Sequence, residues 1–484
     1  MQDFEPHERP IQPPADPPVP PANTPDRYQA AIDYIYRRID YERTSLRRRH
    51  LADFKLQRPD ELLRRLGAPN QQIPAVHIAG TKGKGSTAAM AAAMLTGCGY
   101  RVGLFTSPHM GRFEERMTVD GQMPSAQQLC ALTDRVREVA DVLQAEDSAM
   151  APTFFEITTA LAWLHFVEQE VDIVVLETGL GGRLDTTTLC RPLVTLITSI
   201  SYDHTALLGR TLAAIAREKA GIAKAGVPML SGVLDAEPAR PIAAACERVG
   251  APLYRLDHDL RLTTHRATDD HVDAPDLPRY TVDVETPWRR HAGVPVPLPG
   301  IHQATNAALA LAAMDILNEN GFPSSVASLA SGLAASRCPL RLEVMERKPL
   351  VIVDSAHNGA SIDALCRTLT DIPITRRIGV FGTSRDKDAA AMLERLDGTF
   401  DELILTQYLS NPRALPVGEL SAIAGSLSTP WKTADSPQTA LELARASAGG
   451  NDLICVTGSF FLASETRELL LPVEERMTPT GTST

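Results

Sequence analysis

Eight short apolar runs, separated by stretches with helical periodicity, are the feature of this 484-residue sequence that most restricts its fold. The runs read AVHIAG, RVGLFTS, VDIVVLETG, LVTLITSIS, LVIVDSAHN, RIGVFGTS, DELILTQ and DLICVTGS. Continuous apolar strands that alternate with helices are typical of parallel sheets covered by helices on both faces. The sequence therefore predicts an α/β fold.

The length and the order of these runs predict more than one domain. A boundary is expected near Ser336–Leu340, where a helical stretch ends and new strands begin at RLEVM. The polar stretch 255–295 predicts a hairpin or a loop excursion. Residues 1–24 are rich in proline and predict a disordered tail, and a short flexible tail is expected at 474–484.

Most of the apolar runs end in a residue that can bind a ligand. In open α/β sheets, ligands bind beyond the carboxyl ends of the strands. The chemistry is therefore expected at Gly80–Ser86, Ser107, Glu177, His204 and Asp354–His357.

The stretch AVHIAGTKGKGSTAAM, residues 75–90, has the order of a phosphate-binding loop: strand, glycines, lysine, hydroxyl and helix. It departs from the usual spacing, because the early glycine is Gly80 and Ser86 follows Lys84 one place late. Backbone N–H groups at a helix N-terminus bind anions, and Lys84 would add a positive charge. The alternative is a glycine-rich turn with two solvated lysines.

Four further residues are candidates for chemistry. Glu177 follows an apolar strand and could hold Mg²⁺ beside a nucleotide, or it could be a turn carboxylate. Ser107 could bind a metal ion or a phosphate, or belong to an ordinary Ser-Pro turn. His204 follows the next strand, beside Asp203. Lys219 interrupts an otherwise apolar helical face, where it could instead extend its ammonium to solvent.

Composition excludes several classes of protein. The chain has 59 acidic and 48 basic residues, a net charge of −11, which argues against a nucleic-acid or membrane-surface binder. The seven cysteines are scattered without a C-x-x-C motif, which predicts reduced thiols and neither disulfides nor a zinc site. Without a signal sequence or a long apolar run, the protein is expected to be cytoplasmic.

An ordered set of motifs carries a specific resemblance. The stretches HIAGTKGKGST, TSPHMGRFEERM, ETGLGGRLDTTT, SYDHTALLG, REKAGIAK, HQATNAALA, RLEV and VDSAHN together resemble the folylpolyglutamate synthase and dihydrofolate synthase family of Mur-type ligases. The resemblance runs from about Tyr28 to Leu470. It implies a P-loop ATPase domain with a mostly parallel sheet, at 25–337, and a smaller Rossmann-like α/β domain, at 338–473.

The same resemblance implies a reaction. The family uses ATP and Mg²⁺, with two ions expected, to couple L-glutamate to the carboxylate of dihydropteroate or a reduced folate. The partners would be small molecules, and the protein a monomer. The alternatives are a Mur-type ligase for a different carboxylate and a non-catalytic nucleotide-dependent scaffold. About eighty residues precede Gly80, too few for the UDP-sugar domain of peptidoglycan ligases, and a scaffold would be favoured by loss of Lys84, Glu177 or His204.

Residue roles are also implied by the resemblance. The ATP-binding set is Gly80, Thr81, Lys82, Gly83, Lys84, Gly85, Ser86, Asn306, Arg341, Asp354 and His357. The metal ligands would be Ser107, Glu177 and His204, and the catalytic residues Lys84, Glu177, His204 and Lys219, with Lys219 carbamylated. The pterin side would comprise Thr153, Phe154, Phe155, Glu156, Leu184, Asp185 and Thr186.

The sequence departs from the family pattern at five of its motif positions. Lys82 stands where many members have Asn, Thr178 replaces a usual Val and Thr186 a usual Ala. Leu340 and Ser355 stand where glycine is frequent. Lys82 is expected to leave Lys84 unaffected. Leu340 and Ser355 are expected to reposition the nucleotide contacts without removing them.

Overall fold

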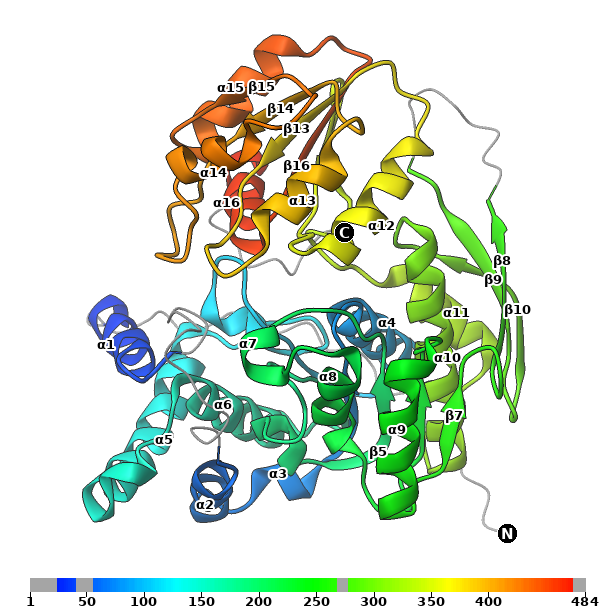
Figure 1. Ribbon diagram of the computed structural model, residues 1–484. Coiled ribbons are helices and arrows are strands. Elements are labelled where there is room, and N and C mark those ends of the chain that lie inside the picture. The colour runs from blue at the N-terminus through cyan, green and yellow to red at the C-terminus, as the bar shows by residue number, and fades with distance from the viewer. Residues whose placement is uncertain (1–23, 41–54, 268–276, 473–484) are drawn as a thin grey trace.

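The computed structural model describes residues 24–40, 55–267 and 277–472, which form two stacked α/β units (Figure 1). The tails predicted at 1–24 and 474–484 lie outside these residues, except for Thr24, where helix α1 (Thr24–Tyr36) begins. Within the described ranges, none of the helices has the length and apolar character needed to cross a membrane.

The first unit is built on a seven-stranded sheet with the order β3-β2-β4-β1-β5-β6-β7. All neighbouring pairs are parallel except β3 with β2 at one edge. Its strands are β1 (Pro74–Ala79), β2 (Val102–Phe105), β3 (Met117–Val119), β4 (Ile173–Glu177), β5 (Arg191–Ile197), β6 (Met229–Ser231) and β7 (Leu253–Arg255). Since β1 lies between β4 and β5, the loops after these three strands are neighbours.

Helices cover both faces of this sheet, as continuous apolar strands require. In β4, Ile173 and Val175 pack into one core, whereas Val174 and Leu176 pack into the other. The first core is shared with α4 (Lys84–Gly97), α10 (Ile301–Glu319) and α11 (Val326–Ala335). The second is shared with α1, α2 (Gln57–Arg65), α5 (Ala126–Glu146) and α6 (Phe154–Glu168).

Four further helices and four 3-10 turns complete the described part of the first unit. They are α3 (Pro69–Gln72), α7 (Thr205–Leu208), α8 (Leu212–Lys219) and α9 (Ala236–Val249), together with the 3-10 turns Phe113–Arg116, Ser148–Met150, Thr186–Leu189 and Ala220–Ile222. The α-helix α8 ends at Lys219, where the chain passes into the 3-10 turn Ala220–Ile222.

The polar stretch 255–295 contains more regular structure than a hairpin. Its strands β8 (Arg261–Arg266), β9 (Tyr280–Glu285) and β10 (Arg290–Val296) form a three-stranded antiparallel sheet. Only one face is apolar: Val282, Val284 and Val294 pack toward α10 and α11, while β8 is largely exposed. This one-sided burial explains why the sequence looked irregular.

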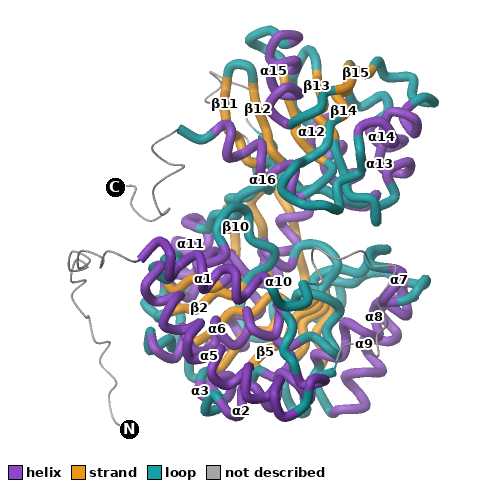
Figure 2. Tube along the Cα trace, turned by 90° about the vertical axis from the view of Figure 1, so that its left-hand side faces the viewer, coloured by secondary structure: helices purple, strands orange, loops and turns teal. Residues whose placement is uncertain are grey.

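The second unit has a six-stranded sheet with the order β11-β12-β16-β13-β14-β15, in which only β11 is antiparallel to its neighbour. Its strands are β11 (Glu343–Arg347), β12 (Leu350–Val353), β13 (Arg377–Phe381), β14 (Glu402–Leu405), β15 (Trp431–Thr433) and β16 (Leu453–Thr457). The helices α12 (Gly359–Thr370), α13 (Ala389–Leu396) and α14 (Val417–Ala424) cover one face, and α15 (Pro437–Ser447) and α16 (Phe460–Leu470) cover the other. Figure 2 shows this unit stacked on the first.

Each of the eight apolar runs forms a strand, so the predicted α/β fold with mostly parallel sheets is confirmed. Outside the stretch 255–295 and its sheet β8–β10, the strands that were not predicted are β3, β6, β7 and β15, which are three residues long and lie at or near sheet edges.

Candidate active site

All the site residues predicted from the sequence line one cavity of about 840 Å³. Its walls come from the carboxyl ends of β1, β4 and β5, from the start of α10, and from the loops of the second unit that follow β12 and β13. Residues more than 270 positions apart therefore meet in one place, as the contact between Lys82 and His357 shows.

The glycine-rich loop after β1 has two positions that only glycine can occupy. Gly80 has φ +154°, and a Cβ there would lie 1.9 Å from Oγ1 of Thr198. Gly83 has φ +85°, and a Cβ would lie 2.3 Å from Oδ1 of Asn306. These glycines let the loop turn sharply into α4, which begins at Lys84 without a side-chain cap among the described residues. The first N–H groups of α4 thus face the cavity as an anion-binding end.

Lys84 and Glu177 face each other across this loop. The Lys84 Nζ lies 3.7 Å from Oε1 of Glu177, and the backbone N–H of Ser107 donates to Oε2 of Glu177 at 3.4 Å. The Glu177 side chain is 8% exposed. Burial raises the pKa of Glu177, although Lys84 and Arg341 oppose this shift. The structure therefore brings a buried carboxylate, a hydroxyl residue and a lysine together at the start of α4.

His204 follows β5 with a left-handed backbone, φ +50°. Its backbone N–H donates to Oδ1 of Asp203 at 2.9 Å, whereas its ring Nδ1 is buried and has no hydrogen-bond partner among the residues that the structure describes. Burial lowers the pKa of His204 to about 3, so its imidazole is neutral near pH 7. A neutral ring nitrogen without a partner is a potential ligand. Across the described part of the chain, no cluster of three or more His, Cys, Asp or Glu side chains is arranged to hold a metal.

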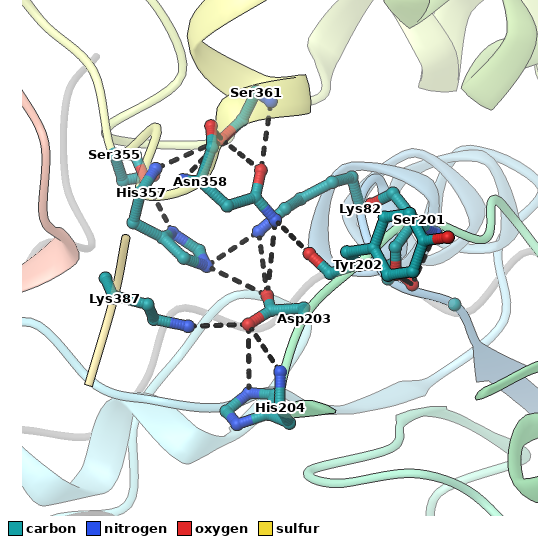
Figure 3. A network of polar contacts seen from close by, with 12 residues as sticks. Lys82, Ser201, Tyr202, Asp203, His204, Ser355, His357, Asn358, Ser361 and Lys387 are labelled. Atoms are coloured by element: carbon teal, nitrogen blue, oxygen red, sulfur yellow. Dashed lines mark hydrogen bonds and ion pairs between the residues drawn. The ribbon is translucent and has the colours of Figure 1, made fainter. Parts of the chain in front are cut away.

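Asp203 joins the two units. Its carboxylate accepts hydrogen bonds from Lys82 at 3.1 Å and from Lys387 of the second unit at 2.6 Å (Figure 3). Burial would raise the pKa of Asp203, but Lys82, His204 and Lys387 outweigh it and hold this pKa well below its usual range. Asp203 was not assigned a role from the sequence, and Lys387 was missed. Both lie just after strands, β5 and β13, where the rule that located the other residues applies equally.

Lys219 is buried at the end of α8, with 5% of its surface exposed. Its Nζ donates to the backbone carbonyl of Gly80 at 2.7 Å. Burial, assisted by Lys84, lowers the pKa of Lys219 to about 7. The lysine therefore does not extend to solvent.

The nucleotide residues predicted downstream form two groups. On α10, Asn306 lies against Gly83 and donates to Gln303 at 2.8 Å. In the second unit, Arg341 donates to Oγ of Ser355 at 2.8 Å, and Asp354 accepts from the backbone N–H groups of Leu342 and Ala356. Burial raises the pKa of Asp354, partly offset by Arg341.

The predicted pterin side lies at the start of α6. Thr153 and Glu156 form a capping box there, and Arg58 holds the Glu156 carboxylate at 2.8 Å. Phe154 is buried against Tyr36, with ring centroids 5.3 Å apart, so it belongs to the core under the cavity. Phe155 is partly exposed. It lies so close to Gly179 that a Cβ on Gly179 would come 2.5 Å from Cζ of Phe155.

Asp185 is engaged by its own loop. It accepts from the N–H of Leu180 at 2.8 Å and from the hydroxyl of Thr187 at 2.5 Å. Burial raises the pKa of Asp185, partly offset by these hydrogen bonds. Leu184 and Thr186 lie on either side of it in the cavity wall.

Two family models match the chain. The model of the Mur ligase middle domain matches residues 78–314, and that of the Mur ligase glutamate ligase domain matches residues 340–460. The chain is 36% identical over 419 residues to the dihydrofolate synthase/folylpolyglutamate synthase of Bacillus subtilis, covering 86% of this chain and 94% of that protein.

Solved structures are similar to this chain over most of its length. The folylpolyglutamate synthase of Mycobacterium tuberculosis complexed with ADP is similar with a TM-score of 0.82 and 30% identity, covering 93% of this chain and 99% of that one. Escherichia coli FolC in complex with DHPP and ADP has a TM-score of 0.78 and 28% identity, covering 93% and 98%. The family, the fold and the ATP-dependent ligase activity predicted from the sequence are thus confirmed. The chain belongs to the folylpolyglutamate synthase and dihydrofolate synthase family of Mur-type ligases.

Proposed function

We propose that this ATP-dependent ligase joins the amino group of L-glutamate to a carboxylate of dihydropteroate, of a reduced folate, or of both. The observation that carries the proposal is the single cavity that contains the phosphate loop, the buried pair Lys84–Glu177 and the pterin-side residues of α6. A phosphoryl donor and a carboxylate acceptor would meet there at the boundary of the two units.

The chemistry requires activation of the acceptor. A carboxylate does not condense with an amine in water, because hydroxide is a poor leaving group. Transfer of the γ-phosphoryl group of ATP to a carboxylate oxygen gives an acyl phosphate and ADP. The amine of glutamate then attacks the acyl carbon, and the tetrahedral intermediate expels phosphate to leave the amide. Catalysis of this kind depends on positioning and on stabilisation of charge.

The protein supplies that charge stabilisation at the start of α4. The N–H groups of its first turn and the ammonium of Lys84 face the place where the terminal phosphates would lie. Gly80 and Gly83 let the backbone approach the nucleotide. Asn306, Arg341, Asp354 and His357 are proposed to contact the nucleotide from α10 and from the second unit.

The residues fit Mg²⁺ by their chemistry. Carboxylate and hydroxyl oxygens are the ligands that Mg²⁺ prefers. Glu177 and Ser107 would hold one ion, and His204, whose buried Nδ1 has no partner in the described part of the chain, would help to hold a second. When bound, the ions neutralise part of the phosphate charge.

The acceptor is proposed to lie along the start of α6 and the loop 179–186. Phe155 offers a partly exposed aromatic face for stacking, beside Gly179. Asp185 and Thr186 would orient the polar edge of a pterin, directly or through the loop that Asp185 holds. The relative whose structure contains DHPP and ADP supports an acceptor of this class.

The test is glutamate incorporation with dihydropteroate and tetrahydrofolate assayed in parallel, with a UDP-muramyl peptide as a third acceptor. We expect ATP-dependent incorporation with at least one of the first two and none with the third. Incorporation only with the muramyl peptide would favour a different Mur-type ligase. Nucleotide binding with no phosphate release on any acceptor would favour a scaffold.

The binding partners, the cellular location and the oligomeric state are also proposals. A net charge of −11 supports small-molecule partners and argues against nucleic acid or an anionic membrane surface. We place the enzyme in the cytoplasm and expect a monomer, which size-exclusion chromatography with light scattering would test.

A further inference from the structure

The carboxylate of Asp203 is the centre of a polar network between the two units (Figure 3). Its Oδ2 lies 3.1 Å from Nζ of Lys82 and 3.4 Å from Nδ2 of Asn358, and its Oδ1 lies 2.6 Å from Nζ of Lys387. Lys82 belongs to the phosphate loop, whereas Asn358 and Lys387 belong to the second unit. One carboxylate of the first unit therefore holds three segments together.

Lys82 makes a second contact, which, unlike its contact with Asp203, crosses the boundary between the two units. Its Nζ lies 2.7 Å from Nε2 of His357, whose Nδ1 lies 2.9 Å from the carbonyl oxygen of Ser355. Because a carbonyl only accepts, Nδ1 of His357 carries the proton and Nε2 is left as an acceptor. The ammonium of Lys82 therefore donates to His357 and to Asp203 at once.

The backbone of Lys82 is also occupied. Its N–H donates to Oγ of Ser199 at 3.0 Å, and its carbonyl accepts from Oγ1 of Thr198 at 2.6 Å. Each polar group of Lys82 thus has a partner within the protein. This separates Lys82 from Lys84, whose ammonium faces only Glu177, at 3.7 Å, among the described residues.

These contacts are sheltered from solvent. The side chain of Asp203 is 8% exposed, that of Lys387 12% and that of Lys82 23%. Salt screens buried ion pairs weakly, and removal of one partner leaves a buried charge uncompensated. An Asn at position 82, which is common in the family, is too short to make both contacts.

We propose that Lys82 is a positioning residue, which fixes the second unit against the phosphate loop through Asp203 and His357. Lys387 contacts the same carboxylate from the second unit. These four residues, Lys82, Asp203, His357 and Lys387, are called the clasp. The clasp keeps the nucleotide contacts of the second unit within reach of the loop. This inference rests on the proposed function only for its effect on turnover.

The test compares Lys82→Asn with Lys82→Arg in the full-length protein. Three quantities are measured: the affinity for ADP, the radius of gyration by small-angle scattering, and kcat and KM for ligation. Lys432→Asn is the matched control, because Lys432 also pairs with a carboxylate, Glu402, but lies on β15 far from the cavity. Thermal unfolding verifies that each variant is folded.

We expect Lys82→Asn to increase the radius of gyration and to lower kcat at least about tenfold, since misplaced reacting groups lose rate steeply. ADP affinity should change less than about threefold, because Lys84 and the start of α4 are retained. Lys82→Arg should recover much of kcat, and Lys432→Asn should match the parent. Lys82→Asn combined with Asp203→Asn should cost less than the sum of the two single changes, because both break the contact between Lys82 and Asp203, whereas only Lys82→Asn also breaks the contact with His357.

Two results would overturn the proposal. One is a loss of ADP affinity of tenfold or more in Lys82→Asn with unchanged scattering, which would make Lys82 a nucleotide ligand. The other is unchanged scattering and unchanged kcat. Scattering and ADP binding need no folate or glutamate. Absence of glutamate ligation in the parent protein would therefore contradict the proposed function without contradicting the clasp.

Discussion

The hydroxyl of Ser355 donates a hydrogen bond to the backbone carbonyl of Leu340 at 3.1 Å. Both residues stand where glycine is frequent in the family, and Leu340 has φ +60°, the left-handed conformation that glycine adopts at little cost. The same hydroxyl accepts from Arg341 at 2.8 Å. The two departures therefore contact each other and together hold the arginine beside the cavity.

This contact predicts that Ser355→Ala weakens ADP binding. The change leaves Arg341 without its hydroxyl partner, and a hydrogen bond of this kind is worth about 1 kcal/mol, or about fivefold in affinity. Isothermal titration calorimetry measures the effect. Thr186→Ala, a departure on the pterin side, is the control and should leave ADP affinity unchanged. Equal ADP affinity in Ser355→Ala and the parent would show that Arg341 needs no support.

Lys84→Ala should abolish ligation while the protein stays folded. Its ammonium is the charge of the phosphate loop that faces the cavity beside Glu177, and loss of such a contact typically lowers the rate by about 10²–10³-fold. Initial-rate assays measure the loss of ligation, and circular dichroism verifies that the variant is folded. Near-normal turnover would mean that the loop does not hold the terminal phosphates.

Asp185→Ala should impair use of dihydropteroate more than ADP binding. The carboxylate holds the N–H of Leu180 and the hydroxyl of Thr187, so its loss loosens the loop that lines the pterin side. Buried polar groups left without partners reduce affinity strongly. KM for dihydropteroate and Kd for ADP are compared in the variant and in Asp185→Asn, which keeps part of the hydrogen bonding. A similar increase in KM for dihydropteroate and in Kd for ADP would contradict this role.

The fold was predictable because its strands are buried on both faces, as the opposite packing of Val174 and Val175 illustrates. The candidate site was predictable because the carboxyl ends of parallel strands converge, which brings Glu177 beside Lys84. The contact between Asp203 and Lys387 was not predictable, because it joins residues 184 positions apart and depends on how the two units are placed. The sheet β8–β10 was missed as regular structure because only one of its faces is buried.

Acid should destabilise the protein partly through His77. This residue is fully buried in β1, its Nε2 lies 2.9 Å from Oγ1 of Thr187, and burial, assisted by Lys224, lowers its pKa to about 3. The unfolded chain, with a pKa near about 6.5, takes up a proton that the folded chain excludes. The folded state therefore loses stability as pH falls through about 6.5 toward 3, and the stability is complete above that window.

Urea unfolding at pH 6.5 and pH 5 tests this assignment with His77→Gln. Between pH 6.5 and pH 5, one such histidine lowers the free energy of unfolding by about 1.5 kcal/mol. The difference between the free energies of unfolding at the two pH values should be smaller by about that amount in His77→Gln. An unchanged pH dependence in His77→Gln would assign the acid sensitivity to other groups.

Lys219 is expected to react with CO₂ to form a carbamate. Its pKa of about 7, which results first from burial, leaves a large neutral fraction near neutral pH, and the neutral amine is the nucleophile. The amine nitrogen bonds to the carbon of CO₂ and releases one proton, which gives a carboxylate. The carbamate nitrogen keeps one N–H, so the hydrogen bond to the carbonyl of Gly80 can persist.

The carbamate would place a negative charge in a cavity that also contains Lys84 and His204, where it would help to hold the second Mg²⁺. ¹³C NMR of the intact enzyme in labelled bicarbonate should show a carbamate resonance that Lys219→Ala lacks. Carbamates are labile in acid, so the measurement is made at neutral pH on the native protein. Lys219→Ala should lose most of its activity and regain part of it with short carboxylic acids, which would occupy the vacated volume. Absence of the resonance, together with full activity of Lys219→Ala, would leave Lys219 only the structural role of tying α8 to the phosphate loop.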